Sequence, residues 1–342
     1  MRRVARRAAA LALLALPAAA AAQRRLPVID MHLHAHALAD YGGGMPVCMN
    51  REPIVFPAVD PREPITFARE VVRCATPVPS ARTDSALLAE SLAELRRLNV
   101  VRAVTTGTPA LVAAWRAAAP DRILPASDFD LSGRRTVDEL RRLHAEGRIA
   151  AFGEVGPQYD GRRVDDPAYE PYFALAEELD VPVAIHLGEG PAGGAYVLGN
   201  SPYRARLTDA LQLEEVLIRH PRLRVYVMHF GSPLVDETIA LLYSHPQVYV
   251  DVAQNNWGFP RAHFYAQLKR LVDAGFEERI LWGSDQMIWP RAIEVALETI
   301  EQAPFLTARQ KRAILYDNAA RFLRLTPEQV ARDHARARGA TP

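Results

Sequence analysis

Cysteine is scarce in this chain, and that scarcity limits the kinds of metal or redox site it can build. Cys48 and Cys74 are the only two, so no Cys-x-x-Cys pair exists for a zinc ribbon or a dithiol centre. Both lie in one long segment rich in Pro and Gly, residues 37–83. If the protein is exported to an oxidising compartment, we expect them to form a disulfide. Two free, partly buried thiols are the alternative.

An excess of charge is also missing. The chain has 41 Lys and Arg against 40 Asp and Glu. Without residues 1–22, which hold four Arg and no acidic residue, 37 basic and 40 acidic residues remain, a net charge of −3. A near-neutral chain lacks the basic surface typical of nucleic-acid binding, so we expect no nucleic-acid partner. It also lacks a Gly-x-x-x-x-Gly-Lys phosphate loop.

The apolar run near the start is too short to span a bilayer comfortably. Four arginines precede the apolar residues 8–16, and small residues follow as far as Ala22. This pattern predicts a secretory signal peptide over residues 1–22, cleaved before Gln23, and a periplasmic or secreted protein. An uncleaved anchor is the alternative. After cleavage we expect no stable membrane insertion.

Strand and helix patterns alternate through the rest of the chain. Short apolar runs such as residues 181–185 are each followed by a helical pattern, and the opening strand brings the strands to eight. Continuous apolar strands suit a parallel sheet that helices cover. We therefore predict an α/β fold, a (β/α)8 TIM barrel over residues 23–330, with a polar, frayed tail at 331–342. An open doubly wound sheet is the alternative. The insertion at 37–83 follows the first strand, and we expect it to arch over the site.

Six histidine and carboxylate side chains stand where predicted strands end. Two of them, His32 and His34, alternate along the opening strand, so they share a face and can chelate one metal ion. The carboxyl ends of barrel strands meet at one mouth, where a buried charge without a partner is costly. Taken singly, each would more often be a core or capping residue. A shared cation explains the whole set, which comprises His32, His34, Glu154, His186, His229 and Asp285.

The motifs around these residues resemble the amidohydrolase superfamily, in its amidohydrolase-related branch. The likeness extends over nearly the whole mature chain. It implies an enzyme that uses metal-activated water to cleave an amide, lactone or ester bond of a small molecule. The motifs include Asp30-Met31-His32-Leu33-His34, Val248-Tyr249-Val250-Asp251, Leu281-Trp282-Gly283-Ser284-Asp285 and Asn318-Ala319-Ala320-Arg321-Phe322-Leu323.

Glu154 distinguishes two versions of the site that the resemblance implies. Members with a carboxylate on the fourth strand resemble two-metal enzymes. There the carboxylate bridges one ion, held by the opening histidine pair and Asp285, and a second ion held by His186 and His229. Single-metal members, which include decarboxylases, leave His229 free for catalysis. Glu154 favours two ions. The imidazole and carboxylate ligands of the site suit zinc, with manganese as the alternative. We expect Asp285 and His229 to be the catalytic residues.

Loops after the strands are expected to bind the substrate. Tyr159 follows the fourth strand, Arg204 lies in a Gly-rich loop after the fifth, and Asn255 and Trp257 follow the seventh. Two other functions stay open at this stage. One is a single-metal, non-oxidative decarboxylase on the same fold, and the other is a non-catalytic exported binding protein. A homo-oligomer is compatible with the sequence.

Bound metal is the first testable consequence. Because six ligands converge, purified mature protein should carry about one to two zinc equivalents by elemental analysis, and chelation should abolish activity. Protein that holds no metal after growth in zinc-supplemented medium, and does not respond to added metal, would contradict the predicted centre.

Overall fold

The computed structural model describes residues 25–65, 71–129, 131, 135–198 and 202–337. The predicted signal peptide, residues 1–22, lies outside the described residues. Eight parallel strands pair in sequence order, each with the next along the chain. They are β1 (Val28–Ala35), β2 (Val100–Gly107), β3 (Ile123–Ser127), β4 (Ala151–Val155), β5 (Val183–His186), β6 (Val225–Met228), β7 (Val248–Asp251) and β8 (Ile280–Leu281).

The sheet closes between its last strand and its first. Met31 N donates to Trp282 O over 3.0 Å, and His34 N donates to Gln286 O over 3.1 Å. Leu33 also forms a parallel bridge with Gln286, just beyond the end of β8. The predicted (β/α)8 barrel is therefore confirmed, and the open doubly wound sheet is excluded.

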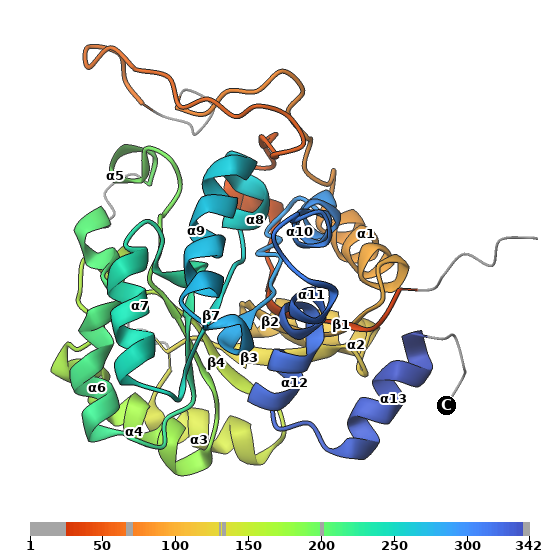
Figure 1. The fold of residues 1–342 in the computed structure, drawn as a ribbon, viewed down its shortest axis with the longest axis vertical. Coiled ribbons are helices and arrows are strands. Elements are labelled where there is room, and N and C mark those ends of the chain that lie inside the picture. Colours follow the sequence, from red (N-terminus) through yellow and green to blue (C-terminus); the bar gives the residue numbers. More distant parts are fainter. Residues whose placement is uncertain (1–24, 66–70, 130, 132–134, 199–201, 338–342) are drawn as a thin grey trace, which may run out of the picture.

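Helices cover the outside of the barrel (Figure 1). Several begin at a threonine whose hydroxyl accepts the backbone N–H three residues further on, as Thr83, Thr108 and Thr136 do. No described helix combines the length and apolar character needed to cross a membrane. The α-helices are α1 (Asp84–Arg97), α2 (Pro109–Ala118), α3 (Val137–Ala145), α4 (Glu170–Leu179), α5 (Gly194–Val197), α6 (Glu214–Arg219), α7 (Val235–Ser244), α8 (Asn255–Gly258), α9 (Arg261–Asp273), α10 (Arg291–Glu301), α11 (Ala308–Arg312), α12 (Asn318–Phe322) and α13 (Pro327–Ala337).

Shorter helical turns connect these elements. They are η1 (Leu38–Tyr41), η3 (Pro157–Asp160), η4 (Pro167–Tyr169), η5 (Ala205–Thr208), η6 (Ala210–Leu213), η7 (His229–Gly231), η8 (Glu277–Arg279) and the π-helical η9 (Ala313–Asp317). Some helical segments change type along their length. Residues 308–322 form α11, η9 and α12 in succession, and residues 210–219 form η6 followed by α6.

The insertion after β1 doubles back on itself. Val47 pairs with Val78 and Val55 with Arg73 in antiparallel bridges. Next to them the disulfide expected for an exported protein is confirmed, since Cys48 and Cys74 are bonded with their Cα atoms 5.7 Å apart. Figure 1 shows the insertion at the top of the molecule, above α5, α8 and α10.

Hydrogen bonds anchor this insertion to loops that follow other strands. Asn50 N donates to Trp257 O over 2.8 Å, and Trp289 Nε1 donates to Met45 O over 2.6 Å. Trp257 follows β7 and Trp289 follows β8, so the insertion lies at the carboxyl end of the barrel. This is the end where the predicted ligands stand.

The chain after residue 330 differs from the expected polar tail. Residues 331–337 belong to α13 instead, and residues 338–342 lie outside the described part. The buried Asp333 accepts from Arg102 Nε at 2.8 Å and from the Tyr316 hydroxyl at 3.0 Å. The polar sequence of this segment did not indicate a packed helix. The segment packs because the buried Asp333 carboxylate accepts hydrogen bonds from Arg102 and Tyr316.

The disulfide should stabilise the insertion and add measurably to the stability of the whole protein. Closing a loop of 26 residues contributes roughly 3 kcal/mol to the free energy of unfolding in the chain-entropy model. Replacing both cysteines by serine should lower that free energy by about this amount in urea unfolding. Thiol labelling of the denatured, unreduced mature protein should find no free cysteine. Two reactive thiols would contradict the bond.

Candidate metal centre

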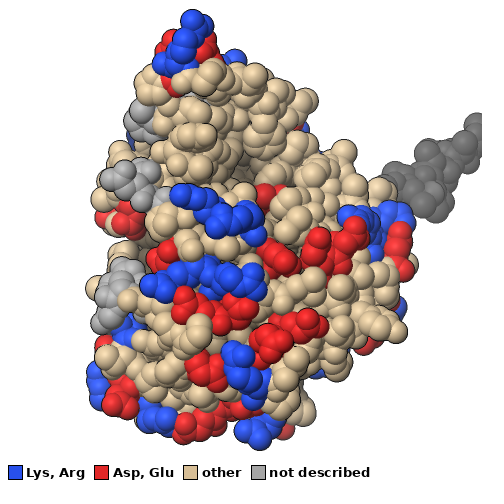
Figure 2. Space-filling view, turned by 90° about the vertical axis from the view of Figure 1, so that its left-hand side faces the viewer, with Lys and Arg blue, Asp and Glu red and all other residues tan. Residues whose placement is uncertain are grey.

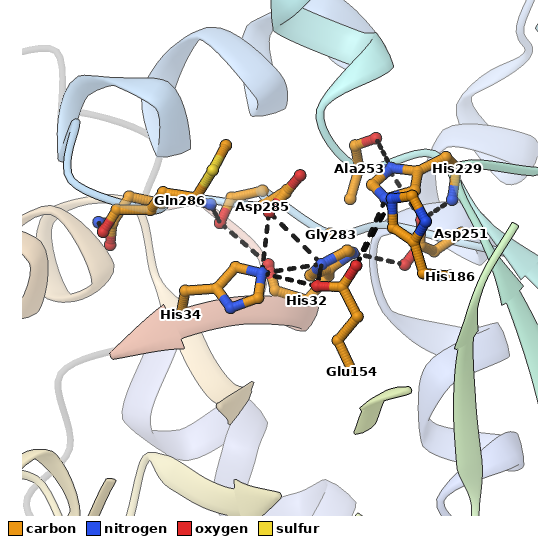
Figure 3. A network of polar contacts seen from close by, with 12 residues as sticks. His32, His34, Glu154, His186, His229, Asp251, Ala253, Gly283, Asp285 and Gln286 are labelled. Atoms are coloured by element: carbon orange, nitrogen blue, oxygen red, sulfur yellow. Dashed lines mark hydrogen bonds and ion pairs between the residues drawn. The ribbon is translucent and has the colours of Figure 1, made fainter. Parts of the chain in front are cut away.

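The six predicted ligands meet at the carboxyl end of the barrel. They come from β1, β4, β5 and the turns after β6 and β8, and the structure brings all six together (Figure 3). The four histidines and Asp285 are buried, and the Glu154 side chain is 17% exposed. Two groups of possible ligand atoms share Glu154, namely His32–His34–Glu154 and Glu154–His186–His229.

Glu154 lies between two pairs of histidines. Its Oε2 is 3.3 Å from His32 Nε2 and 3.1 Å from His34 Nε2. Its Oε1 faces the other pair, 3.6 Å from His186 Nε2 and 4.0 Å from His229 Nε2. Each oxygen of one carboxylate therefore serves a separate pair, which is the arrangement of a bridging ligand.

Asp285 completes the group on the β1 side. Its Oδ1 is 3.0 Å from His34 Nε2 and 3.4 Å from His32 Nε2. The Asp285 backbone has a φ of 47°, in the left-handed region that disfavours most residues, and its N–H donates to His32 O over 2.7 Å. This hydrogen bond between β1 and the turn after β8 holds the carboxylate towards the histidines.

Acceptors outside the centre orient three of the imidazole rings. His32 Nδ1 donates to Asp251 Oδ2 at 3.0 Å, and His229 Nδ1 donates to Ala253 O at 3.0 Å. His186 Nδ1 lies 3.3 Å from the side-chain oxygen of Gln158. With the proton on Nδ1, each Nε2 presents a lone pair to the centre, as metal-ligating histidines do.

Sequence reasoning assigned no role to Asp251 or Asp30. Besides His32, Asp251 accepts from the His229 backbone N–H at 2.8 Å. Asp30 accepts from the Ser284 hydroxyl at 2.6 Å and from the His32 backbone N–H at 3.0 Å. Burial raises the pKa of Asp30 to about 6, against these hydrogen bonds. Asp30 lies in β1 and Asp251 lies in β7. A carboxylate on a buried strand is the sequence signal that could have indicated their role beside the ligands.

One strand irregularity accompanies the histidine pair. Between Asp30 and Leu33, β1 advances by three residues while the paired β2 advances by two, from Ala103 to Thr105. Such a bulge re-aims side chains on its own strand. Even so, His32 Nε2 and His34 Nε2 lie 3.2 Å apart, so the shared face expected from alternation is kept at the centre.

The electrostatics of the centre favour a bound cation. Burial opposes protonation of His34, but the Asp285 and Glu154 carboxylates outweigh it and raise the pKa of His34 to about 9. Burial likewise opposes ionisation of Glu154, but the surrounding histidines hold the pKa of that carboxyl well below its ordinary value. On the opposite side burial, then the neighbouring His229, lowers the pKa of His186 to about 3. Lone pairs and carboxylates that crowd together in this way fit a divalent ion, and these donor types suit zinc or manganese.

A glycine-rich loop after β5 packs tightly against this centre. A Cβ on Gly188 would come within 2.4 Å of His229 Cβ, and one on Gly190 within 2.7 Å of the Tyr203 ring. The Gly188-x-Gly190-x-x-Gly193 spacing of this loop thus allows close packing at these two positions.

The four residues expected to bind substrate have different surroundings. The Tyr159 hydroxyl is 3.1 Å from His186 Nε2, so Tyr159 borders the centre. Asn255 is buried, and its Nδ2 donates to Glu189 Oε2 over 3.2 Å, while its Oδ1 has no hydrogen-bond partner among the described residues. Substrate contact by these two residues stays a prediction.

The other two expected substrate residues, Trp257 and Arg204, have other contacts in the structure, and their contact with substrate stays a prediction. Trp257 is buried, and its Nε1 donates to Ser284 O over 2.6 Å, so it supports the turn that carries Asp285. Arg204 is exposed, and its Nη1 donates to the carbonyl of the preceding Tyr203. The expectation that Arg204 meets the substrate therefore lacks a supporting contact among the described residues.

Together these features define a class of protein, a (β/α)8 barrel whose strand ends gather histidines and carboxylates suited to a divalent cation. The family profile described as amidohydrolase matches residues 29–325, and the chain belongs to the amidohydrolase family. No curated protein matches its sequence.

Solved structures share the fold at low identity. An uncharacterised TIM-barrel protein from Bordetella bronchiseptica is 20% identical, with a TM-score of 0.60 over 90% of this chain and 100% of that one. A probable 2-pyrone-4,6-dicarboxylic acid hydrolase from Acinetobacter baumannii is 17% identical, with a TM-score of 0.56 over 88% of this chain and 100% of that one. A 5-carboxyvanillate decarboxylase from Novosphingobium aromaticivorans with bound manganese is 16% identical, with a TM-score of 0.51 over 68% of this chain and 80% of that one. At these identities the likeness shows the fold alone.

Zinc affinity should rise with pH because zinc and a proton compete for His34. With a pKa of about 9, His34 is protonated at neutral pH and must lose that proton to bind metal. The apparent affinity should therefore increase by at least about tenfold per unit between roughly pH 7 and pH 9. Competition against a chromophoric chelator measures this slope, with His144→Asn on α3 as a control outside the centre. An affinity that does not change with pH would contradict the shift.

Proposed function

We propose that this protein is an exported metal-dependent hydrolase that cleaves an amide, lactone or ester bond of a small molecule. The observation that carries the proposal is the position of Glu154, with one oxygen towards each of two histidine pairs. Asp285 stands on the β1 side, within 3.4 Å of both histidines of that pair.

Zinc is the proposed cofactor, as one or two ions, with manganese as the alternative. The pair on β1 with Asp285 would hold one ion, His186 and His229 would hold the other, and Glu154 would serve both. Bound there, a divalent cation supplies Lewis-acid chemistry, which polarises a carbonyl and lowers the pKa of water to near 7. The manganese in the decarboxylase neighbour is compatible with the same donor types.

Asp285 is the proposed proton carrier. Its neighbouring histidines outweigh burial and lower the pKa of its carboxyl, so the group is ionised at neutral pH and can accept a proton from attacking water. It can then pass that proton to the leaving group as the bond breaks. The backbone hydrogen bond from Asp285 N to His32 O keeps the carboxylate in place through both steps.

Export is part of the proposal. It rests on the signal pattern at residues 1–22, which lie outside the described residues, and on the Cys48–Cys74 bond. Disulfides persist in oxidising compartments and are rare in reducing ones. A periplasmic or secreted location fits both observations.

A single-metal decarboxylase is the second candidate function. One observation favours it, because His229 Nε2 is 4.0 Å from Glu154, the longest of the four histidine distances. In that version His229 would be free to act on the substrate as a general acid or base. A metal-supplemented screen of amides, lactones, esters and aromatic carboxylic acids separates the two, since only decarboxylation releases carbon dioxide.

Two substitutions should divide the roles of the carboxylates. Asp285→Asn keeps the size but removes the base, so turnover should fall roughly 10²–10⁴-fold while most metal is retained. Glu154→Gln should weaken the bridge, so metal content should drop towards one equivalent and excess zinc should partly restore the rate. Turnover and elemental analysis measure both, with the exposed Asp138→Asn and Glu90→Gln as matched controls.

The second substitution can overturn the two-metal version. If Glu154→Gln leaves metal content and rate unchanged, a bridging role is wrong, and the single-metal site with catalytic His229 becomes the better account. If Asp285→Asn retains full turnover, the proton passes through another group.

A further inference from the structure

A chain of aromatic rings extends from His34 on the β1 side of the centre. The His36 ring stacks on His34 with centroids 4.7 Å apart, and Tyr41 meets His36 at 5.4 Å. Trp289 meets Tyr41 at 5.6 Å and is itself held by its hydrogen bond to Met45 O. His36 and Tyr41 are half-buried. We call these three rings, His36, Tyr41 and Trp289, the first aromatic wall.

A second aromatic wall stands on the other side of Glu154. Tyr159 packs on His186 with centroids 4.7 Å apart, and Tyr203 packs on Tyr159 at 5.6 Å with an interplanar angle of 31°. Tyr203 is fixed because its hydroxyl accepts from Gly190 N at 2.9 Å. In Figure 3, His34 and His186 lie on opposite sides of Glu154. The walls that pack on these two histidines therefore flank the centre.

No described Lys or Arg forms an ion pair with the carboxylates of the centre. Among the described residues, the carboxylates of Glu154, Asp251 and Asp285 form ion pairs with histidines only. Bidentate recognition of a substrate carboxylate or phosphate usually falls to arginine. Among the described residues, the ion pairs of the centre therefore offer an anionic substrate group the bound cation and the histidines, and no Lys or Arg.

The two loops that carry Tyr41 and Tyr203 expose apolar as well as charged side chains. Large apolar side chains are exposed on the insertion, at Val55 and Phe56, and on the loop after β5, at Tyr196 and Leu198. The two segments approach each other, since a Cβ on Gly193 would lie 3.2 Å from Val71. Figure 2 shows Lys, Arg, Asp and Glu over the middle and lower parts of the face, with a largely uncharged area between them and the charged tip at the top.

We propose that the centre takes an uncharged, planar ring compound, whose ring lies between the two aromatic walls while its labile carbonyl meets the cation. The inference rests on the proposed metal centre and names the class of substrate. Offset-stacked and edge-to-face contacts with several rings favour a flat aromatic partner over a puckered aliphatic one. Because no described Lys or Arg pairs with the carboxylates of the centre, a neutral ring is favoured over a dicarboxylate.

Three hydroxamates test the ring site because they share one metal-binding group and differ in the ring. We expect benzohydroxamate to bind the zinc-loaded protein about tenfold more tightly than cyclohexanehydroxamate in isothermal titration calorimetry, given the usual strength of aromatic pairs. Benzohydroxamate with carboxylates at both meta positions should bind more weakly than the parent compound. This readout does not depend on turnover.

Variants of Tyr41 in the first wall test whether its ring causes the tighter binding of benzohydroxamate. Tyr41→Leu should reduce the aromatic preference several-fold, while Tyr41→Phe retains it because the ring remains. Tyr243→Leu on α7 is the matched control, since that tyrosine is 85% exposed and lies outside both walls.

Several results would overturn the ring site. They are equal affinity for the two uncharged hydroxamates, tighter binding of the dicarboxylate, no binding of any of the three, or a Tyr41→Leu variant with unchanged preference. A protein that shows the ring preference but cleaves no ester, lactone or amide would instead overturn the hydrolase proposal and leave the ring site standing.

Discussion

The carboxylate of Glu154, held among four imidazoles at the mouth of the barrel, is the constraint on which the rest of the centre depends. Taking a carboxylate out of water is costly unless positive charge or hydrogen bonds replace the water. Here the compensating groups are histidines, and they can supply that charge as bound protons or as ligands to a cation. Because one oxygen faces each pair, both pairs must keep their orientation for Glu154 to be compensated.

That orientation comes from groups behind the histidines. Asp251 receives the Nδ1 proton of His32 and also the backbone N–H of His229, so one buried carboxylate couples the two sides of the centre. Trp257 and Asp30 both hold Ser284, the residue before Asp285. Closure of the barrel between β8 and β1 is therefore part of the site, since it sets the distance from Asp285 to the histidine pair.

Two loops place aromatic rings beside this centre. The insertion brings Tyr41 beside His36, which stacks on His34 of β1, and the loop after β5 brings Tyr203 beside Tyr159. In (β/α)8 barrels the loops at the carboxyl ends of the strands carry much of the variation between functions. In this chain they contribute rings and apolar side chains, whereas the described carboxylates of the centre pair with histidines alone.

The sequence by itself determined the order of strands and helices, the barrel and the six residues that converge, because each depends on local patterns. Apolar runs mark buried strands, and a polar residue at the end of such a run is visible without a structure. Tertiary structure decided the rest. Asp251 is 219 residues from His32, and no local pattern shows that they share a proton. Helix α13 looked like a polar tail because its buried Asp333 acquires a partner only when Arg102, on β2, lies beside it. Substrate contact by Trp257 and Arg204 stays a prediction, and the contacts these side chains make, with Ser284 O and Tyr203 O, depend on packing that no local pattern shows.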